Sequence, residues 1–233
     1  MTPLRIDPQP APAPAADPLR PRPAAGIDWP HWTRLLDRRR RTLVVPAVWP
    51  GWVYRDMTRA SFRLDGIDVQ AADVTDALTP PRSQPLRSRP ARRLRAHIAI
   101  LRSLDRSRRQ GLRLSPGRVV RWYTSVSSGL STSGLAAADD ERLAAVVRRI
   151  NSPQRRLQPA VLETARLHAE LLADPMFPSF NGILARLLLH AHLAACGLPP
   201  VVFDADSGPI PIPAAVTATL LARLEVSLNR LAG

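Results

Sequence analysis

The stretch Phe177–Arg186, which reads FPSFNGILAR, decides the fold. Residues 183–196 that follow its Asn-Gly pair are apolar on nearly every side, which predicts a helix inside a protein core. An amphipathic segment at 159–172 predicts a second helix that enters the loop. The first backbone N–H groups of a helix have no partners within the helix, so this arrangement predicts an anion site at Asn181-Gly182. The same pair is also ordinary turn chemistry, and the sequence leaves both interpretations open.

The rest of the chain predicts helices rather than strands. Asp28 before Pro30, and Ser115 before Pro116, are typical of helix starts. Apolar residues at helical spacing complete the pattern. The predicted helices cover residues 28–41, 94–104, 115–122, 139–150, 159–172, 183–196 and 213–228. Two short strand candidates, 42–48 and 201–204, do not change the predicted class, which is all-α.

Proline-rich segments divide the chain into three parts. Residues 1–26 hold eight prolines among alanines, a composition that predicts an extended, disordered tail. Four prolines in 79–90 predict a linker or long loop. The sequence therefore predicts an N-terminal helical extension over 27–90, including the linker, and a core domain over 91–233.

The net charge of +14 is compatible with binding to nucleic acid, because arginines neutralise phosphates. All 33 basic residues are arginine, however, and with so much Ala and Pro this indicates the codon bias of a GC-rich genome. The Arg-rich stretches 38–41 and 82–109 also lack interleaved aromatic residues for base stacking. We therefore interpret the charge as solvated helix faces and keep nucleic-acid binding only as a third candidate function.

Cysteine content and hydropathy point to the cytoplasm. A single cysteine, Cys196, cannot form an intramolecular disulfide and fits a reducing compartment. Residues 1–26 have no apolar core of a secretory signal. No apolar run reaches the roughly 18 residues that a membrane-spanning helix needs. We expect a soluble, cytoplasmic protein with no membrane partner.

The stretch around Asn181-Gly182 resembles the active-site motif of the Fic/Doc (Fido) family, H-P-F-x-(D/E)-G-N-G-R-x-x-R. Aligned without gaps, it matches at Phe177, Asn181, Gly182 and Arg186. The likeness extends over residues 160–204, from the helix that enters the loop to the end of the motif helix. It implies a Fic/Fido-type helical bundle in which Asn181, Gly182 and Arg186 bind nucleotide, with ATP and Mg²⁺ as the possible cofactors.

An upstream segment resembles the inhibitory motif of the same family, (S/T)-x-x-x-E-(G/N). Residues 61–66 read SFRLDG, with Ser61, Asp65 and Gly66 at the motif positions and Asp in the Glu position. The resemblance implies that the N-terminal extension lies over the loop and that Asp65 forms an ion pair with Arg186. A buried charge on an apolar helix needs a partner in any case, so the same pair also has a purely structural interpretation.

The chemistry of the family is not supported at three motif positions. Pro175 occupies the position of the catalytic histidine and cannot accept a proton, and Asp174 is a weak substitute with an ordinary pKa near 3.9. Ser179 replaces the acid that holds the metal, and Ile183 replaces the first arginine. Residues 125–134 also lack the alternating pattern of the hairpin that docks a target in the family.

The remaining histidines do not form a predicted metal site. His190 and His192 point about 200° apart on a helix, so they do not share a metal. His192 and Cys196 provide only two ligands, and we interpret His168 as a hydrogen-bonded core residue.

The resemblance as a whole predicts a pseudoenzyme that binds a nucleotide or a partner and lacks histidine-dependent AMP transfer. The alternative is a divergent nucleotidyl or phosphoryl transferase that modifies a hydroxyl of an unknown protein target, which would make the chain adenylyltransferase-like.

Overall fold

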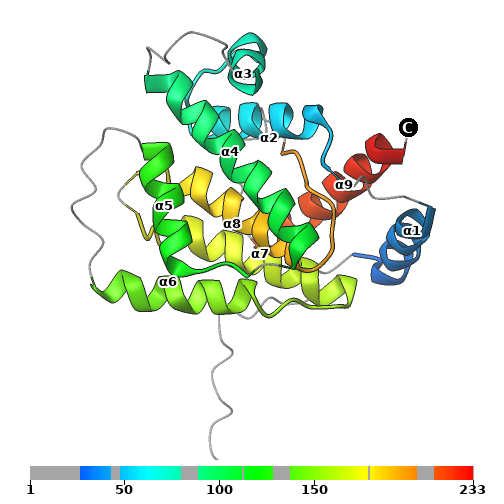
Figure 1. The fold of residues 1–233 in the computed structure, drawn as a ribbon. Coiled ribbons are helices and arrows are strands. Elements are labelled where there is room, and N and C mark those ends of the chain that lie inside the picture. The colour runs from blue at the N-terminus through cyan, green and yellow to red at the C-terminus, as the bar shows by residue number, and fades with distance from the viewer. Residues whose placement is uncertain are drawn as a thin grey trace, which may run out of the picture.

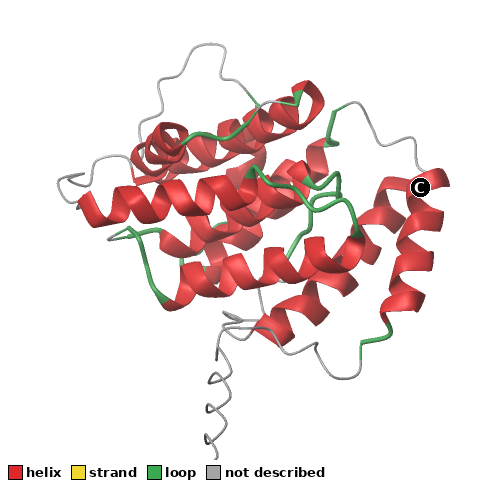
Figure 2. Ribbon diagram, turned by 90° about the horizontal axis from the view of Figure 1, so that it is seen from below, coloured by secondary structure: helices red, strands yellow, loops and turns green. Residues whose placement is uncertain are grey.

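The computed structural model describes residues 27–42, 48–79, 89–111, 113–127, 137–177, 179–203 and 213–232. Every regular element within these ranges is an α-helix, so the predicted all-α class is confirmed (Figure 2). None of these helices combines the length and the hydropathy needed to cross a membrane. In chain order they are α1 (Trp29–Thr42), α2 (Gly51–Leu64), α3 (Ala71–Leu78), α4 (Arg89–Gln110), α5 (Pro116–Ser127), α6 (Ala137–Ile150), α7 (Leu157–Ala173), α8 (Asn181–Ala195) and α9 (Pro213–Ala232).

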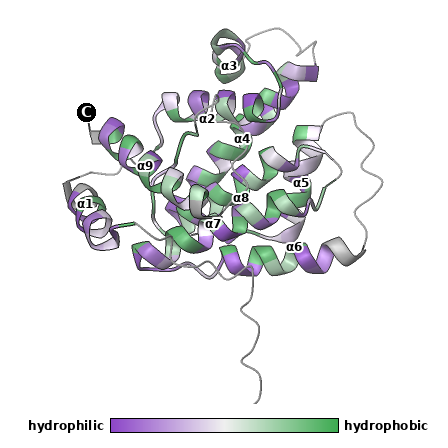
Figure 3. Ribbon diagram, turned by 180° about the vertical axis from the view of Figure 1, so that it is seen from behind, coloured by the Kyte–Doolittle hydropathy of each residue, from purple (hydrophilic) through white to green (hydrophobic). Residues whose placement is uncertain are grey.

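Helix α8 forms the centre of the bundle. It packs against α2, α4, α6 and α7, which surround it in Figure 1. Every residue from Ile183 to Ala194 is buried, as its apolar sequence predicts. Its neighbours are amphipathic: their apolar residues are buried, and Figure 3 shows hydrophobic and hydrophilic residues alternating along their ribbons. The helix that carries the motif is therefore also the core of the fold.

Two apolar clusters meet along α8. One joins α2, α4, α5 and α6 to the Leu184 and Leu187 side of α8. The other joins α1, α7 and α9 to the opposite side, at Leu189 and Leu193. Contacts of α2 with α4 and α8, and of α1 with α7 and α9, bind the predicted N-terminal extension to the predicted core. Substitutions in α2 therefore act directly on the position of α8.

A buried carboxylate fixes the start of α2 against α4. Asp105 on α4 accepts hydrogen bonds from the Trp49 backbone N–H and the Tyr54 hydroxyl, both at 3.3 Å. Arg108 pairs with the same carboxylate at 3.1 Å. Burial, together with the negative charge of Asp105, raises the pKa of Tyr54 to about 12. The phenol therefore stays protonated as the donor that this contact needs.

Several helix ends follow the sequence signals. The Asp28 carboxylate accepts the His31 backbone N–H at 2.9 Å, as expected of a helix cap. Helix α5 begins at Pro116, as predicted. Helix α8 ends in a left-handed Gly197 (φ 69°), where the Leu198 N–H donates to the Leu193 carbonyl at 2.8 Å.

Other predictions are corrected or lie outside the described residues. Helix α8 begins at Asn181 rather than at 183, so Asn-Gly forms its first turn and not a preceding loop. The segment 201–203 is not a strand. The predicted tail at 1–26, residues 43–47 of the other strand candidate, residues 80–88 of the linker and residues 128–134 of the docking hairpin position lie outside the described residues.

Candidate functional site

The conformation of the loop before α8 is fixed by one strained residue and two contacts. Phe180 has φ 55°, the left-handed region that a bulky residue rarely adopts. The Arg93 guanidinium lies 4.7 Å from the centre of the Phe180 ring, a cation–π distance. The Asn181 side-chain amide donates to the Leu171 carbonyl at 2.5 Å, which ties the start of α8 to α7. The sequence placed the turn at Asn181-Gly182, but the left-handed residue is the phenylalanine before it.

The carboxylate of Asp65 occupies the N-terminal end of α8. Asp65 follows directly after α2, and its Oδ2 accepts the backbone N–H of Ile183 at 3.2 Å. A helix N-terminus favours negative charge because its first N–H groups are unpaired and its dipole is positive there. The anion that the sequence predicts at this point is therefore a side chain of the protein itself.

Arg186 reaches the same carboxylate from one turn further along α8. The ion pair expected between Asp65 and Arg186 is present, through Nη2 and Oδ1. Arg186 Nε also donates to the Ser61 hydroxyl at 2.9 Å, and Nη2 donates to the Ser61 carbonyl at 2.6 Å. Only 8% of the Arg186 side chain is exposed. Burial lowers the pKa of Arg186, and the charge of Asp65 opposes that shift.

Gly182 permits the close approach of Asp65. A Cβ added at Gly182 would overlap the carboxylate, with the carboxyl carbon 3.1 Å away and Arg186 Nη1 at 3.2 Å. Because Asp65 is held by the Ile183 N–H and by Arg186, it has little freedom to move aside. The glycine of the motif is thus explained by this contact and not by a positive φ.

We expect Gly182→Ala to lower the free energy of unfolding by about 1–3 kcal/mol, the usual cost of overpacking. The cost outweighs the roughly 1 kcal/mol that alanine gains over glycine in a helix. Urea denaturation followed by circular dichroism measures it.

Two matched variants control that measurement. Gly117→Ala in α5 adds a Cβ that meets nothing within 4 Å, so it should be neutral or slightly stabilising. Gly182→Ala introduced into an Asp65→Ala background should cost nothing further. If Gly182→Ala lowers the free energy of unfolding equally in the Asp65→Ala protein, the contact with Asp65 is not the cause of the loss.

Three buried histidines lie around Arg186, and the sequence did not bring them together. They are His97 on α4, His168 on α7 and His190 on α8. Burial, with the nearby charge of Arg186, lowers the pKa of His97 to about 3 and that of His168 to about 4. Burial and the other two histidines lower the pKa of His190 to about 3. All three are neutral near pH 7, so Arg186 is the only charge in this group of four side chains.

These histidines have few partners of their own. His97 Nδ1 lies 3.0 Å from the Thr58 hydroxyl, and its ring packs edge-on to Phe62. The Nδ1 atoms of His168 and His190 have no hydrogen-bond partner within the described part of the chain. His168 nevertheless makes a backbone hydrogen bond with Ala185, so it is the hydrogen-bonded core residue that the sequence predicts. A cavity of about 10 Å³ borders His97, His190 and Arg186, roughly the space of one water molecule. The described residues contain no group of three or more His, Cys, Asp or Glu arranged to hold a metal.

The other motif positions carry no reactive group. Pro175 is exposed, and the exposed Asp174 carboxylate pairs with Arg142 at 2.9 Å. The Ser179 hydroxyl lies 3.4 Å from the Tyr123 hydroxyl, and the Tyr123 ring stacks on Phe177 at 4.8 Å. Ile183 contributes only its backbone N–H. The structure therefore brings together Ser61, Asp65, Gly182 and Arg186, and it leaves Asp174 engaged elsewhere.

Comparison with known proteins adds no assignment. Neither the models of known protein families nor the curated proteins include a match to this chain.

Proposed function

We propose that this chain is a Fic-like pseudoenzyme that binds a nucleotide or a partner and lacks histidine-dependent AMP transfer. The proposal rests on one observation: Asp65 and Arg186, placed by the resemblance in an inhibitory motif and a nucleotide motif, meet at the start of α8. In this proposal Asp65 occupies the position of an anionic ligand and closes the site. A cytoplasmic location remains a prediction from cysteine content.

The residues present fit a phosphate group better than a metal. The Ile183 N–H and the Arg186 guanidinium both contact an oxygen anion already, and they are the donors that a phosphate would use. A phosphate therefore competes with Asp65 for the same donors. Magnesium on phosphates is normally held by a carboxylate, and Ser179 offers only a neutral hydroxyl. We accordingly derive no role for Mg²⁺ in this site.

Calorimetric titration with ATP tests the proposal. We expect Asp65→Ala to bind ATP at least tenfold more tightly than the wild type, because the competing carboxylate is gone. The affinity should be the same in EDTA as with Mg²⁺. Asp56→Ala is the matched control, because this residue is on α2 but pairs with Arg55 and Arg230 away from the site. No heat from either the wild type or Asp65→Ala at millimolar ATP would reject nucleotide binding and leave only a partner-binding role.

The alternative of an active transferase depends on Asp174 as a base. Its carboxylate pairs with Arg142, and Arg142 also donates to the Asp174 carbonyl at 2.5 Å. Incubation of the wild type and Asp65→Ala with labelled ATP and cell lysate tests this alternative. Labelling of a lysate protein that is lost when Asp174→Asn is used would establish the transferase. Absence of labelling with both the wild type and Asp65→Ala would exclude it.

A further inference from the structure

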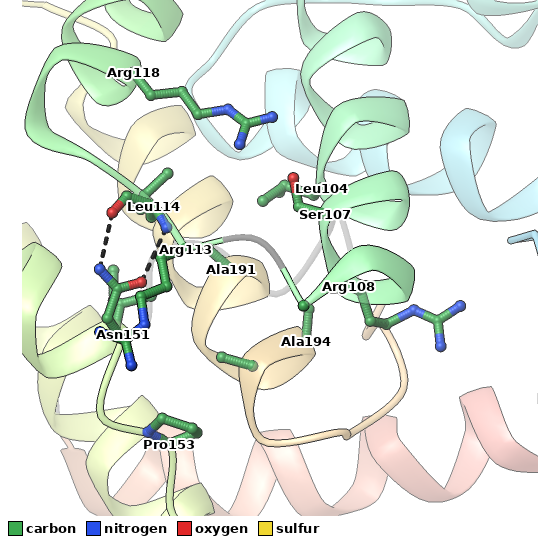
Figure 4. Close-up of a pocket in the computed structure, with 13 residues that line it drawn as sticks. Leu104, Ser107, Arg108, Arg113, Leu114, Arg118, Asn151, Pro153, Ala191 and Ala194 are labelled. Atoms are coloured by element: carbon green, nitrogen blue, oxygen red, sulfur yellow. Dashed lines mark hydrogen bonds between the residues drawn. The ribbon is translucent and has the colours of Figure 1, made fainter.

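A second cavity lies against the C-terminal half of α8. It has a volume of about 300 Å³, at the lower end of the range for small-molecule sites. Its walls are the end of α4, the segment at 113–114, the start of α5 and the residues that follow α6 (Figure 4). The α8 residues that line it begin at Ala191, eight positions beyond Ile183 and thus roughly 12 Å along the helix. We call this cavity the α4–α8 pocket.

The α4–α8 pocket is basic. Arg108, Arg113 and Arg118 line it, and none of the described residues that line it is acidic. Arg108 points away from the other labelled side chains in Figure 4, and it pairs with Asp105 at 3.1 Å. Arg113 is exposed at the rim. Arg118 donates to the Ser103 hydroxyl at 2.5 Å, and this bond uses one of the five N–H donors that a guanidinium carries.

A buried hydroxyl in the same wall has no partner. Ser107 is 8% exposed, and its Oγ makes no hydrogen bond within the described part of the chain. Figure 4 shows Ser107 and Arg118 pointing toward the same side of the pocket. Buried hydroxyls are normally hydrogen-bonded, so an unpaired one that lines a cavity indicates a ligand or water partner. An anion beside Arg118 would accept a hydrogen bond from the Ser107 hydroxyl.

The rest of the pocket is rigid and apolar. The Asn151 amide oxygen accepts the Leu114 N–H at 2.9 Å, and its nitrogen donates to the Leu114 carbonyl at 2.8 Å (Figure 4). This pair of bonds holds the wall at 113–114 against the end of α6. Leu104, Ile150 and three alanines of α8 form the apolar surface. The small alanine side chains leave space for a compact apolar body.

We propose that the α4–α8 pocket binds a small organic anion: one phosphate, sulfate or carboxylate group carried on a compact apolar body. Arg118 and Arg113 contact the anionic group, Ser107 donates to it, and the apolar body lies on Ala191 and Ala194. The site is separate from the start of α8, and it does not depend on the function proposed there.

Titration of the full chain with phenyl phosphate tests this site, with phenol and inorganic phosphate as the two halves of the probe. Calorimetry should give an affinity for phenyl phosphate at least tenfold above either half. We expect Arg113→Gln/Arg118→Gln to weaken it at least tenfold. Arg106→Gln/Arg121→Gln is the charge-matched control, because these exposed arginines are on α4 and α5, the helices on either side of the segment at 113–114, but do not line the pocket. Equal binding by the two double variants would overturn the proposal, as would equal binding of phenol and phenyl phosphate.

Two further variants separate ligand binding from folding. Ser107→Ala removes a buried unpaired hydroxyl, so it should raise the melting temperature by about 2–4 °C while it weakens phenyl phosphate binding several-fold. Ala195→Leu fills the pocket from its exposed side and should reduce binding at least tenfold with an unchanged circular dichroism spectrum. Unchanged affinity in both variants would place the ligand elsewhere and overturn the assignment.

Discussion

Asp65→Ala is expected to lower the free energy of unfolding by about 3–5 kcal/mol, the usual cost of removing one partner of a buried ion pair. Among the described residues, the substitution leaves the buried Arg186 guanidinium with Ser61 as its one hydrogen-bond partner. It also leaves the Ile183 N–H without its acceptor. A buried charge without a counter-charge costs far more than the net stability that the pair contributes. Urea denaturation at pH 7, followed by tryptophan fluorescence and circular dichroism, measures the difference.

The control for this prediction is on the same helix. Asp56 pairs with Arg55 at 2.9 Å and with Arg230 at 3.0 Å, but both arginines are partly exposed to solvent. Exposed pairs contribute about 0–1 kcal/mol, so Asp56→Ala should have little effect. Asp65→Ala/Arg186→Met should recover much of the lost stability, because no buried charge remains. If Asp65→Ala lowers the free energy of unfolding as little as Asp56→Ala does, the ion pair is not what holds α2 to α8.

The same variant links stability to the proposed function. A ligand that binds only the folded protein stabilises it by about 2.7 kcal/mol at a concentration one hundred times its dissociation constant. ATP that replaces the missing carboxylate should therefore restore much of the free energy of unfolding that Asp65→Ala loses. It should change the free energy of unfolding of the wild type little. An ATP effect of the same size on Asp56→Ala would indicate binding at another site.

The sequence predicts the parts of this fold that depend on local pattern. The burial of α8 follows from its apolar residues, and the starts of α1 and α5 follow from Asp28 and Ser115-Pro116. The contact of Asp65 with Arg186 was predicted only because the order of two short motifs resembles a known family. Without that order, two residues separated by 121 positions give no local signal of contact.

The rest depends on tertiary packing and has no local signal. His97, His168 and His190 come from three helices, and only the packing of α4 and α7 on α8 brings them to Arg186. The left-handed Phe180 contradicts the usual preference for Asn or Gly. The α4–α8 pocket is formed by side chains from separate parts of the chain, and those parts read as ordinary arginine-rich helices, a loop and the apolar helix α8.

Acid is expected to unfold this protein in the range between pH 6.5 and pH 4. The pKa values of His97 and His190 are about 3, and that of His168 is about 4, against about 6.5 in an unfolded chain. Within this range the unfolded state binds more protons than the folded state, so stability falls as the pH falls. Burial also lowers the pKa of His192, whose Nδ1 lies 2.7 Å from the Thr164 hydroxyl, so it acts in the same direction.

The expected loss is large compared with the stability of a typical domain. At pH 5 each of the three histidines around Arg186 costs about 2 kcal/mol, and together they cost about 6 kcal/mol. Natural domains have only about 5–15 kcal/mol in total. Urea denaturation at several pH values should therefore give a slope that approaches about 4 kcal/mol per pH unit near pH 5, which corresponds to three protons.

Histidine variants identify the source of that slope. His168→Leu/His190→Leu removes two of the three histidines around Arg186, the two whose Nδ1 atoms lack partners within the described part of the chain, so the slope should fall to about one third. His31→Gln changes an exposed histidine on α1 and should leave the slope unchanged. Carboxylates that are ion-paired in the fold, such as Glu170, lose their contribution only below about pH 4.5. A slope of less than one proton between pH 6.5 and pH 5 would mean that the histidines around Arg186 are open to solvent, and that α8 is less tightly enclosed than its contacts indicate.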